Sequence, residues 1–267
     1  MKLFIKHFER SVFENLLKSI NHIDFSLFVD DVPRKQEDLS PINILVLQEP
    51  NEYFGLHDYA IKNHQLFSFI LTWSDIVINN CENALFLPFG SPWVTSEHDN
   101  IKEFKLTHLC GKLLKTYGHM LRHEILNRQN EFTIPINFYK TYGKRFPFEE
   151  ATKSKIELFS NSQFAVVIEN TSHNGYFTEK LTDCLMLKTI PLYWGCSDIH
   201  KYFNTEAIIQ FSNVDELICK CNKLTENVYG DKLDIVNENK ELVKKYMHYE
   251  QRICDKIAEI LTSNKII

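Results

Sequence analysis

Short apolar runs alternate with polar or amphipathic stretches along most of the chain. The runs are rich in Val, Ile, Leu and Phe, and each is followed by a turn or a helix-like stretch. Such runs predict strands, and strands that alternate with helices predict βα units with parallel sheets. The expected strands lie within residues 25–31, 42–50, 67–74, 84–90, 104–111, 135–143, 163–170, 189–195 and 207–212.

A polar stretch without periodicity, residues 92–104, separates two series of these units. It predicts a domain boundary near Asn100. We therefore expect an N-terminal α/β domain over residues 1–99 and a C-terminal α/β domain over residues 100–267. The fold class predicted is α/β, with two parallel sheets.

Helical periodicity appears near the end of the chain. We expect helices within residues 214–230 and within residues 238–264. The second stretch predicts one long closing helix, because its apolar residues recur at roughly helical spacing. These residues are Leu242, Val243, Tyr246, Tyr249, Ile253, Ile257 and Ile260.

Composition and charge narrow the class of protein. The 267 residues are 44% hydrophobic and 24% charged, as in a soluble globular protein, and the net charge of -5 argues against a nucleic-acid partner. The seven cysteines include no Cys-x-x-Cys pair, which favours a reducing compartment. Lys6, His7, Glu9 and Arg10 interrupt the N-terminal apolar residues, so neither a signal peptide nor a membrane span is expected. The sequence therefore predicts a soluble, cytoplasmic protein.

The segment from Glu169 to Gly195, ENTSHNGYFTEKLTDCLMLKTIPLYWG, concentrates polar and charged residues at a predicted helix start. Thr178 is a good N-cap, so a helix is expected to begin there. Backbone N–H groups at a helix start, with the Lys180 charge in the first turn, suit a phosphate group. Glu179 would repel phosphate but could accept hydrogen bonds from ribose hydroxyls. The alternative is that the helix dipole stabilises Glu179 in the first turn and that Lys180 is only solvated.

Two further polar residues precede this helix directly after an apolar run. Glu169 and Asn170 follow FAVVI, at what should be the carboxyl end of a parallel strand, where open α/β sheets bind ligands. With Tyr176, Glu179 and Lys180 they are expected to converge on one crevice. A simple turn at the strand end is the alternative for Glu169 and Asn170 taken alone.

This segment resembles the donor-binding signature of the α1,3/4-fucosyltransferases, glycosyltransferase family 10. That signature reads Phe-Glu-Asn-Ser, a variable loop, Tyr-x-Thr-Glu-Lys-[Leu/Ile], then [Ile/Val]-Pro-[Ile/Val]-Tyr-Trp-Gly. The chain has Ile168 in place of the Phe and Thr171 in place of the Ser, and it matches the rest closely. The resemblance implies the GT-B architecture, with two Rossmann-like domains facing across a cleft and the nucleotide sugar GDP-fucose held by the C-terminal one.

The resemblance also implies roles for individual residues of the donor site. Glu179 and Lys180 would hold the ribose and the diphosphate, and Tyr176 and Asn170 would complete the site with Glu169. Family members carry a basic residue directed at the diphosphate in the region that corresponds to residues 112–126, and Arg122 is our match. A guanidinium can bridge phosphate oxygens. The alternative is that Arg122 only caps or solvates its helix, and Lys112 and His119 are weaker candidates nearby.

Transfer of fucose to an acceptor, the reaction that the resemblance implies, needs a carboxylate on the acceptor side. An inverting transfer requires a base that takes the proton of the acceptor hydroxyl. The family places its acceptor-side Glu after a strand of the N-terminal domain, and Glu49, after the run INILVLQ, is our candidate, with Glu52 as a fallback. A solvated loop glutamate is the alternative interpretation of Glu49.

No Asp-x-Asp motif follows a strand, so no metal site is expected and no cofactor is expected to be required, a divalent cation being at most stimulatory. The leading prediction is a GDP-fucose-dependent fucosyltransferase acting on a hydroxyl of a glycan acceptor, with an α1,3 linkage. A transferase that uses another nucleotide sugar, and an inactive nucleotide-sugar-binding relative, remain alternatives. Golgi relatives carry a stem and a membrane anchor. We expect neither in this chain, which favours a bacterial or viral origin.

Overall fold

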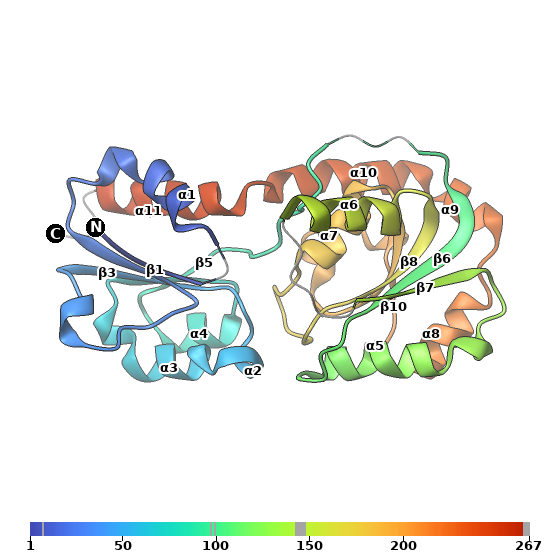
Figure 1. Ribbon diagram of the computed structural model, residues 1–267, viewed down its shortest axis with the longest axis horizontal. Helices are drawn as coiled ribbons and strands as arrows, with labels where there is room; N and C mark the ends of the chain where they lie inside the picture. The colour runs from blue at the N-terminus through green and yellow to red at the C-terminus, as the bar shows by residue number, and fades with distance from the viewer. Residues whose placement is uncertain (7, 97, 99, 142–147, 264–267) are drawn as a thin grey trace. The chain divides into compact units, whose positions relative to one another are not determined.

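The computed structural model describes residues 1–6, 8–96, 98, 100–141 and 148–263, with the side chains of residues 148–152 left aside. The described chain forms two compact units (Figure 1). The first comprises residues 1–89 and the C-terminal segment that begins at His248, and the second comprises residues 90–247.

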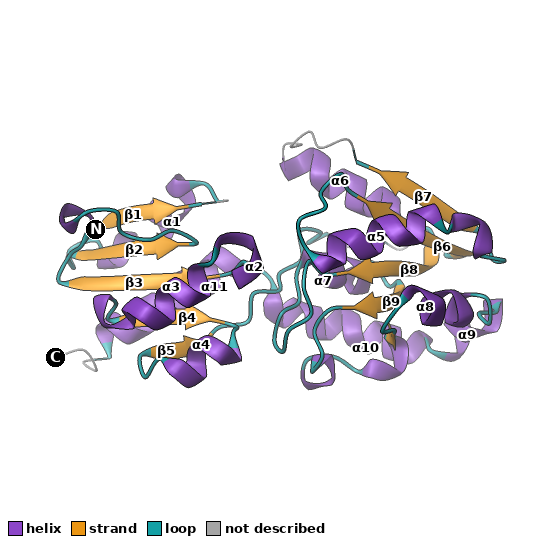
Figure 2. Cartoon of the chain, turned by 90° about the horizontal axis from the view of Figure 1, so that it is seen from below, coloured by secondary structure: helices purple, strands orange, loops and turns teal. Residues whose placement is uncertain are grey.

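The first unit is built on a five-stranded parallel sheet with the order β1-β2-β3-β4-β5, which Figure 2 shows side by side. The strands are β1 (Lys2–Ile5), β2 (Phe25–Val29), β3 (Ile42–Leu47), β4 (Phe69–Thr72) and β5 (Ala84–Phe86). Its helices are α1 (Arg10–Leu16), α2 (Asn51–Phe54), α3 (Leu56–Asn63), α4 (Asp75–Asn80) and α11 (Tyr249–Thr262).

Helices cover both faces of this sheet, which explains why its central strands are apolar throughout. Leu27 and Val46 face the layer that contains α1 and α11, whereas Phe28 and Leu45 face α3 and α4. Successive residues of a strand point to opposite faces, so a continuous apolar run fills two cores at once. The strands end at one edge, where Asp30 and Glu49 follow β2 and β3.

The second unit also contains a five-stranded parallel sheet, with the order β10-β9-β8-β6-β7. The strands are β6 (Glu103–Cys110), β7 (Ile136–Lys140), β8 (Ser162–Ile168), β9 (Ile190–Trp194) and β10 (Ile209–Gln210). Its helices are α5 (Tyr117–Asn127), α6 (Phe148–Phe159), α7 (Glu179–Met186), α8 (Val214–Cys221), α9 (Glu226–Asp231) and α10 (Leu233–Val243).

In this second unit α6, α7 and α10 lie over one face of the sheet, and α5 and α8 lie over the other (Figure 1). Val167 of β8 packs in the first layer with Leu181 and Leu185 of α7, while its neighbour Val166 packs in the second layer with Leu121 of α5. The chain order of the strands reverses between β8 and β6, and open α/β sheets bind ligands at the carboxyl ends of strands beside such a reversal.

The expected α/β class is confirmed and each of the nine predicted regions contains a strand, although residues 142 and 143 of the region 135–143 lie outside the described residues. The strand β1 was not anticipated. The long helix expected over residues 238–264 is interrupted after Val243, and His248 adopts a left-handed conformation with φ of 56° before α11 begins. Residues 90–99 group with the second unit, and α11 groups with the first. This division differs from the expected boundary at Asn100.

The physical reason for the position of α11 lies in its apolar face. Tyr249, Ile253 and Ile257 are buried against the first sheet in the same layer as Phe13 of α1. Without α11 that face of the sheet would expose a large apolar area to water, which is unfavourable. Among the described residues, no helix is both long enough and apolar enough to cross a membrane.

Candidate functional site

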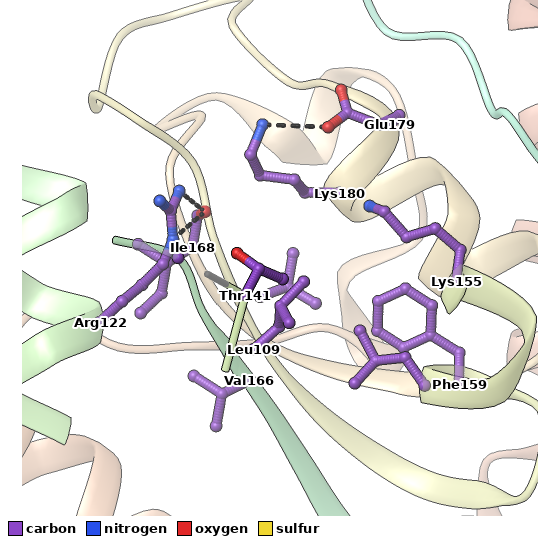
Figure 3. Close-up of a pocket in the computed structure, with 12 residues that line it drawn as sticks. Leu109, Arg122, Thr141, Lys155, Phe159, Val166, Ile168, Glu179 and Lys180 are labelled. Atoms are coloured by element: carbon purple, nitrogen blue, oxygen red, sulfur yellow. Dashed lines mark hydrogen bonds and ion pairs between the residues drawn. The ribbon is translucent and has the colours of Figure 1, made fainter. Parts of the chain in front are cut away.

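A pocket of about 200 Å³ opens at the carboxyl ends of β6 and β8 in the second unit (Figure 3). Arg122, Lys155, Glu179 and Lys180 provide its charged side chains, and residues of β6, β8 and α6 provide apolar walls. The remaining lining residues are Leu109, Gly111, Thr141, Leu158, Phe159, Val166, Val167 and Ile168. A largely apolar hollow with a few convergent charged groups is the usual form of a small-molecule site.

The first turn of α7 carries two of the predicted site residues into this pocket. Thr178 caps the helix as expected, since its hydroxyl accepts a hydrogen bond from the Lys180 N–H at 3.3 Å. The Lys180 ammonium lies 3.2 Å from the Glu179 carboxylate and 3.0 Å from the Thr178 hydroxyl. The Lys180 side chain is 26% exposed, so its charge remains accessible from solvent.

Glu179 is ionised at neutral pH. Burial opposes ionisation, but the ammonium groups of Lys180 and Lys155 outweigh it and lower the pKa of Glu179 to about 2. An ionised carboxylate accepts hydrogen bonds and donates none, which suits contact with the hydroxyl groups of a ligand.

Arg122 reaches the pocket wall from α5. Its guanidinium donates to the Ile168 carbonyl at 2.6 Å and 3.2 Å and to the Asn170 side-chain oxygen at 3.1 Å. Burial is the main cause that lowers its pKa. Arg122 therefore holds the carboxyl end of β8, and within the described residues its Nη1 makes no hydrogen bond.

Glu169 lies behind the pocket and is completely buried. Its carboxylate accepts hydrogen bonds from the Thr178 N–H at 2.9 Å and the Thr178 hydroxyl at 2.7 Å, and Lys180 approaches it at 3.7 Å. Burial is the main cause that raises its pKa. The sequence placed Glu169 among the ligand contacts, whereas its side chain ties the end of β8 to the start of α7.

Two glycines permit this close arrangement. A Cβ on Gly118 would overlap the Glu169 carbonyl oxygen, and a Cβ on Gly195 would press against the Glu169 side chain. The Gly118 N–H donates to the Asn170 carbonyl at 3.1 Å, which joins α5 to the same strand end. Only a residue without a side chain fits at these two positions.

Tyr176 and Asn170 do not line the pocket. Tyr176 is completely buried, and Asn170 is nearly so. Of the weaker candidates, Lys112 is exposed in the loop after β6, and the His119 ring accepts a hydrogen bond from the Thr116 N–H at 3.2 Å at the start of α5. Burial, with Arg122 nearby, lowers the pKa of His119 to about 4, so this ring is neutral at physiological pH.

Lys155 of α6 is a pocket residue that the sequence analysis missed. Its ammonium lies 3.5 Å from the Asp183 carboxylate and 5.4 Å from the centre of the Trp93 ring. Several lysines occur in this part of the sequence, and nothing in their spacing distinguishes Lys155. Only the packing of α6 beside α7 brings it to the site.

Glu49 belongs to the first unit, where three side chains hold the backbone that carries it. Asp30 accepts the N–H groups of Gln48 and Glu49 at 2.9 Å and 3.3 Å, and Trp73 Nε1 donates to the Gln48 carbonyl at 2.6 Å. His57 Nε2 lies 3.1 Å from the Glu49 carbonyl. Glu49 as a residue is partly exposed, while its Oε2 is buried.

Asp30 adopts a left-handed conformation with φ of 46°, in which its buried carboxyl reaches those two N–H groups. Burial raises its pKa to about 6. Glu52, the fallback base, is exposed in α2. In the part of the chain that the structure describes, no group of three His, Cys, Asp or Glu side chains is arranged to hold a metal ion.

Comparison with known proteins identifies relatives for both the sequence and the fold. The family model described as "Glycosyltransferase family 10 (fucosyltransferase) C-term" matches residues 114–263. An α-(1,3)-fucosyltransferase of Helicobacter pylori is 38% identical over 92 residues, which are 33% of this chain and 19% of that protein. A putative fucosyltransferase of Acanthamoeba polyphaga mimivirus is 36% identical over 97 residues, 34% of this chain and 16% of that protein. These matches thus cover less than a fifth of the relatives' length.

Among solved structures, a crystal structure of an α1,3-fucosyltransferase superposes with a TM-score of 0.59 at 16% identity and covers 100% of this chain and 91% of that one. The same class of enzyme solved with GDP-fucose gives a TM-score of 0.53 at 15% identity, with 92% and 91% coverage. At this identity the likeness concerns the fold, and the GT-B class expected from the sequence is confirmed.

Proposed function

The chain belongs to glycosyltransferase family 10, the fucosyltransferases, and on that premise we propose that it transfers fucose from GDP-fucose to a hydroxyl group of a glycan. The observation that carries the proposal is the convergence of Arg122 and Lys180 on one pocket beside the start of α7. A diphosphate is the part of a nucleotide sugar that such cations and helix N–H groups recognise. The α1,3 linkage is taken from the relatives.

On this proposal the second unit binds the donor. Lys180 and the first N–H groups of α7 contact the diphosphate, and Arg122 supports them from the opposite wall. Glu179, which is ionised because Lys180 and Lys155 lower its pKa to about 2, accepts hydrogen bonds from the ribose hydroxyls. Glu169 then acts by holding Thr178 at the start of α7, and Asn170 by accepting a hydrogen bond from Arg122, while Tyr176 is buried near Arg122.

The chemical step we propose is an inverting displacement at the anomeric carbon of fucose. Glu49 takes the proton of the acceptor hydroxyl, the hydroxyl oxygen forms a bond to that carbon, and the bond from that carbon to the diphosphate oxygen breaks. GDP leaves with the electron pair, and the cations of the pocket stabilise its developing negative charge. We propose that these cations serve without a required metal ion.

Calorimetric titration of the purified protein with GDP, GDP-fucose, GDP-mannose and two UDP-sugars tests the donor assignment. We expect GDP and GDP-fucose to bind selectively. A preference for a UDP-sugar would replace fucose by another donor, and no binding of any nucleotide would refute the site.

The variant Lys180→Ala tests the position of the diphosphate. A charge-assisted contact contributes about 1.5–3 kcal/mol, so we expect GDP to bind roughly ten- to a hundredfold more weakly. Lys223→Ala, at an exposed position after α8, is the matched control and should bind GDP like the wild type. Unchanged GDP affinity in a folded Lys180→Ala protein would contradict the proposal.

A further inference from the structure

Lys155 is held in an unusual position for a surface lysine. Its side chain is only 11% exposed, and it runs along α6 with its ammonium 5.8 Å from the centre of the Phe159 ring and 5.4 Å from that of Trp93. Figure 3 shows this ammonium directed toward the stem of Lys180, with Arg122 on the other side of the view. Aromatic faces attract cations and restrict the side chain, so its charge is fixed at the pocket wall.

The nearby carboxylate of Asp183 offers a purely structural explanation for this charge. Asp183 is buried and accepts hydrogen bonds from the Trp93 N–H at 2.7 Å and the Val94 N–H at 3.0 Å. Both bonds end on the same oxygen, Oδ1, and Lys155 lies 3.5 Å from the other oxygen, Oδ2. That separation is too long for a good hydrogen bond, so the ion pair leaves donors of the ammonium directed elsewhere.

The three cations that line the pocket differ in how they are engaged. Of the charged groups that line it, Arg122, Lys155 and Lys180 are cations and Glu179 is an anion. Arg122 is committed to the end of β8, and Lys180 is shared between Glu169 and Glu179. Lys155 makes its described ion pair with Asp183, further along α7, and not with Glu169 or Glu179.

We propose that Lys155 is a further donor-binding residue, which contacts the diphosphate of the nucleotide sugar beside Lys180. This inference rests on the proposed function of the same site. It assigns to α6, a helix outside the signature segment, a direct part in holding the leaving group. Asp183, Trp93 and Phe159 then serve to orient the ammonium.

The variant Lys155→Met tests the contact, because Met preserves the length and apolar stem of the side chain while removing the charge. We expect GDP to bind about tenfold more weakly by calorimetric titration, which corresponds to roughly 1.4 kcal/mol. Lys153→Met, at an exposed position of the same helix, is the matched control and should bind GDP like the wild type.

The double variant Lys155→Met with Asp183→Asn separates a lost contact with GDP from the effect of leaving Asp183 without its ion-pair partner. It removes both members of the ion pair, so no uncompensated carboxylate is left buried. If Lys155 contacts the diphosphate, the double variant still binds GDP about tenfold more weakly than the wild type. Wild-type affinity in the double variant, or in Lys155→Met alone, would overturn the inference.

These outcomes differ from a failure of the proposed function. If the wild-type protein itself does not bind GDP, the donor assignment is refuted and the role of Lys155 falls with it. If the wild type and Lys153→Met bind GDP equally well and the Lys155 variants do too, only the inference about Lys155 is refuted.

Discussion

His108 is a fully buried histidine on β6 directly behind the pocket wall. Its Nε2–H donates to the Arg122 carbonyl at 3.0 Å, so the ring supports the helix that carries the guanidinium. Burial, together with the charge of Arg122, lowers the pKa of His108 to about 4. The ring is therefore neutral in the folded protein at physiological pH, and it fixes the position of Arg122 without adding charge.

The low pKa of His108 in the folded protein predicts that the free energy of unfolding depends on pH. Between pH 6.5 and about 4 the unfolded chain binds a proton at His108 and the folded chain does not, so the free energy of unfolding falls as the pH falls through this window. One proton corresponds to a slope of about 1.4 kcal/mol per pH unit. His108→Gln should flatten the slope by up to this amount, measured by urea unfolding at a series of pH values.

His200→Gln, at an exposed position of the same unit, provides the control and should keep the wild-type slope. An unaltered slope in His108→Gln would mean that this histidine is protonated in the folded protein.

The connection between β8 and α7 depends on one buried carboxylate. Glu169 ends the strand, Thr178 begins the helix, and the two hydrogen bonds between them span the intervening loop. Gly118 and Gly195 allow α5 and the end of β9 to approach the same point. The first turn of α7, with Glu179 and Lys180, is therefore positioned by the strand end and not by the helix alone.

Glu169→Ala should weaken this connection. The variant leaves the buried Thr178 N–H without its acceptor, and an unsatisfied buried donor costs about 1–3 kcal/mol. We expect a loss of about that size in the free energy of unfolding, measured in urea, together with weaker GDP binding because α7 is no longer held. Glu157→Ala, exposed on α6, should change neither quantity. Wild-type stability and GDP affinity in Glu169→Ala would show that the connection is not needed.

In the proposed reaction the two α/β units have different roles: the second unit binds the donor and the first unit carries the base. The charged pocket belongs entirely to the second unit, while Glu49, Asp30, Trp73 and His57 belong to the first. The bonds from Asp30, Trp73 and His57 fix the backbone at Gln48 and Glu49, as expected for a catalytic group that must be held accurately. Binding and transfer should therefore be separable by mutation.

Glu49→Gln is the variant that separates them. It should bind GDP and GDP-fucose with wild-type affinity while the rate of fucose transfer falls about a hundredfold or more, because general-base catalysis contributes about 10²–10⁴ in rate. Transfer is measured in the presence of EDTA, where the wild type should remain active if no metal ion is required. Glu52→Gln, in the exposed turn of α2, is the control and should retain transfer. Full transfer activity in Glu49→Gln would exclude Glu49 as the base.

The local pattern of the sequence determined the strands, the fold class and the start of α7. A strand buried on both faces needs a continuous apolar run, and a helix start needs a cap such as Thr178, so both are visible within a few residues. Local pattern also predicted that Glu169 and Asn170 lie at the carboxyl end of a strand, in one crevice with Glu179 and Lys180. It missed β1, where Leu3, Phe4 and Ile5 are the only apolar run between Lys2 and Lys6.

The tertiary structure decided what depends on segments far apart in the chain. It placed α11 on the first sheet, because the apolar face of a helix specifies burial but not the surface that will cover it. It brought Lys155 to the pocket through the packing of α6 beside α7, and it turned Glu169 away from the pocket to bind Thr178. In each case the residue type fixed which interactions were possible, and packing selected the partner.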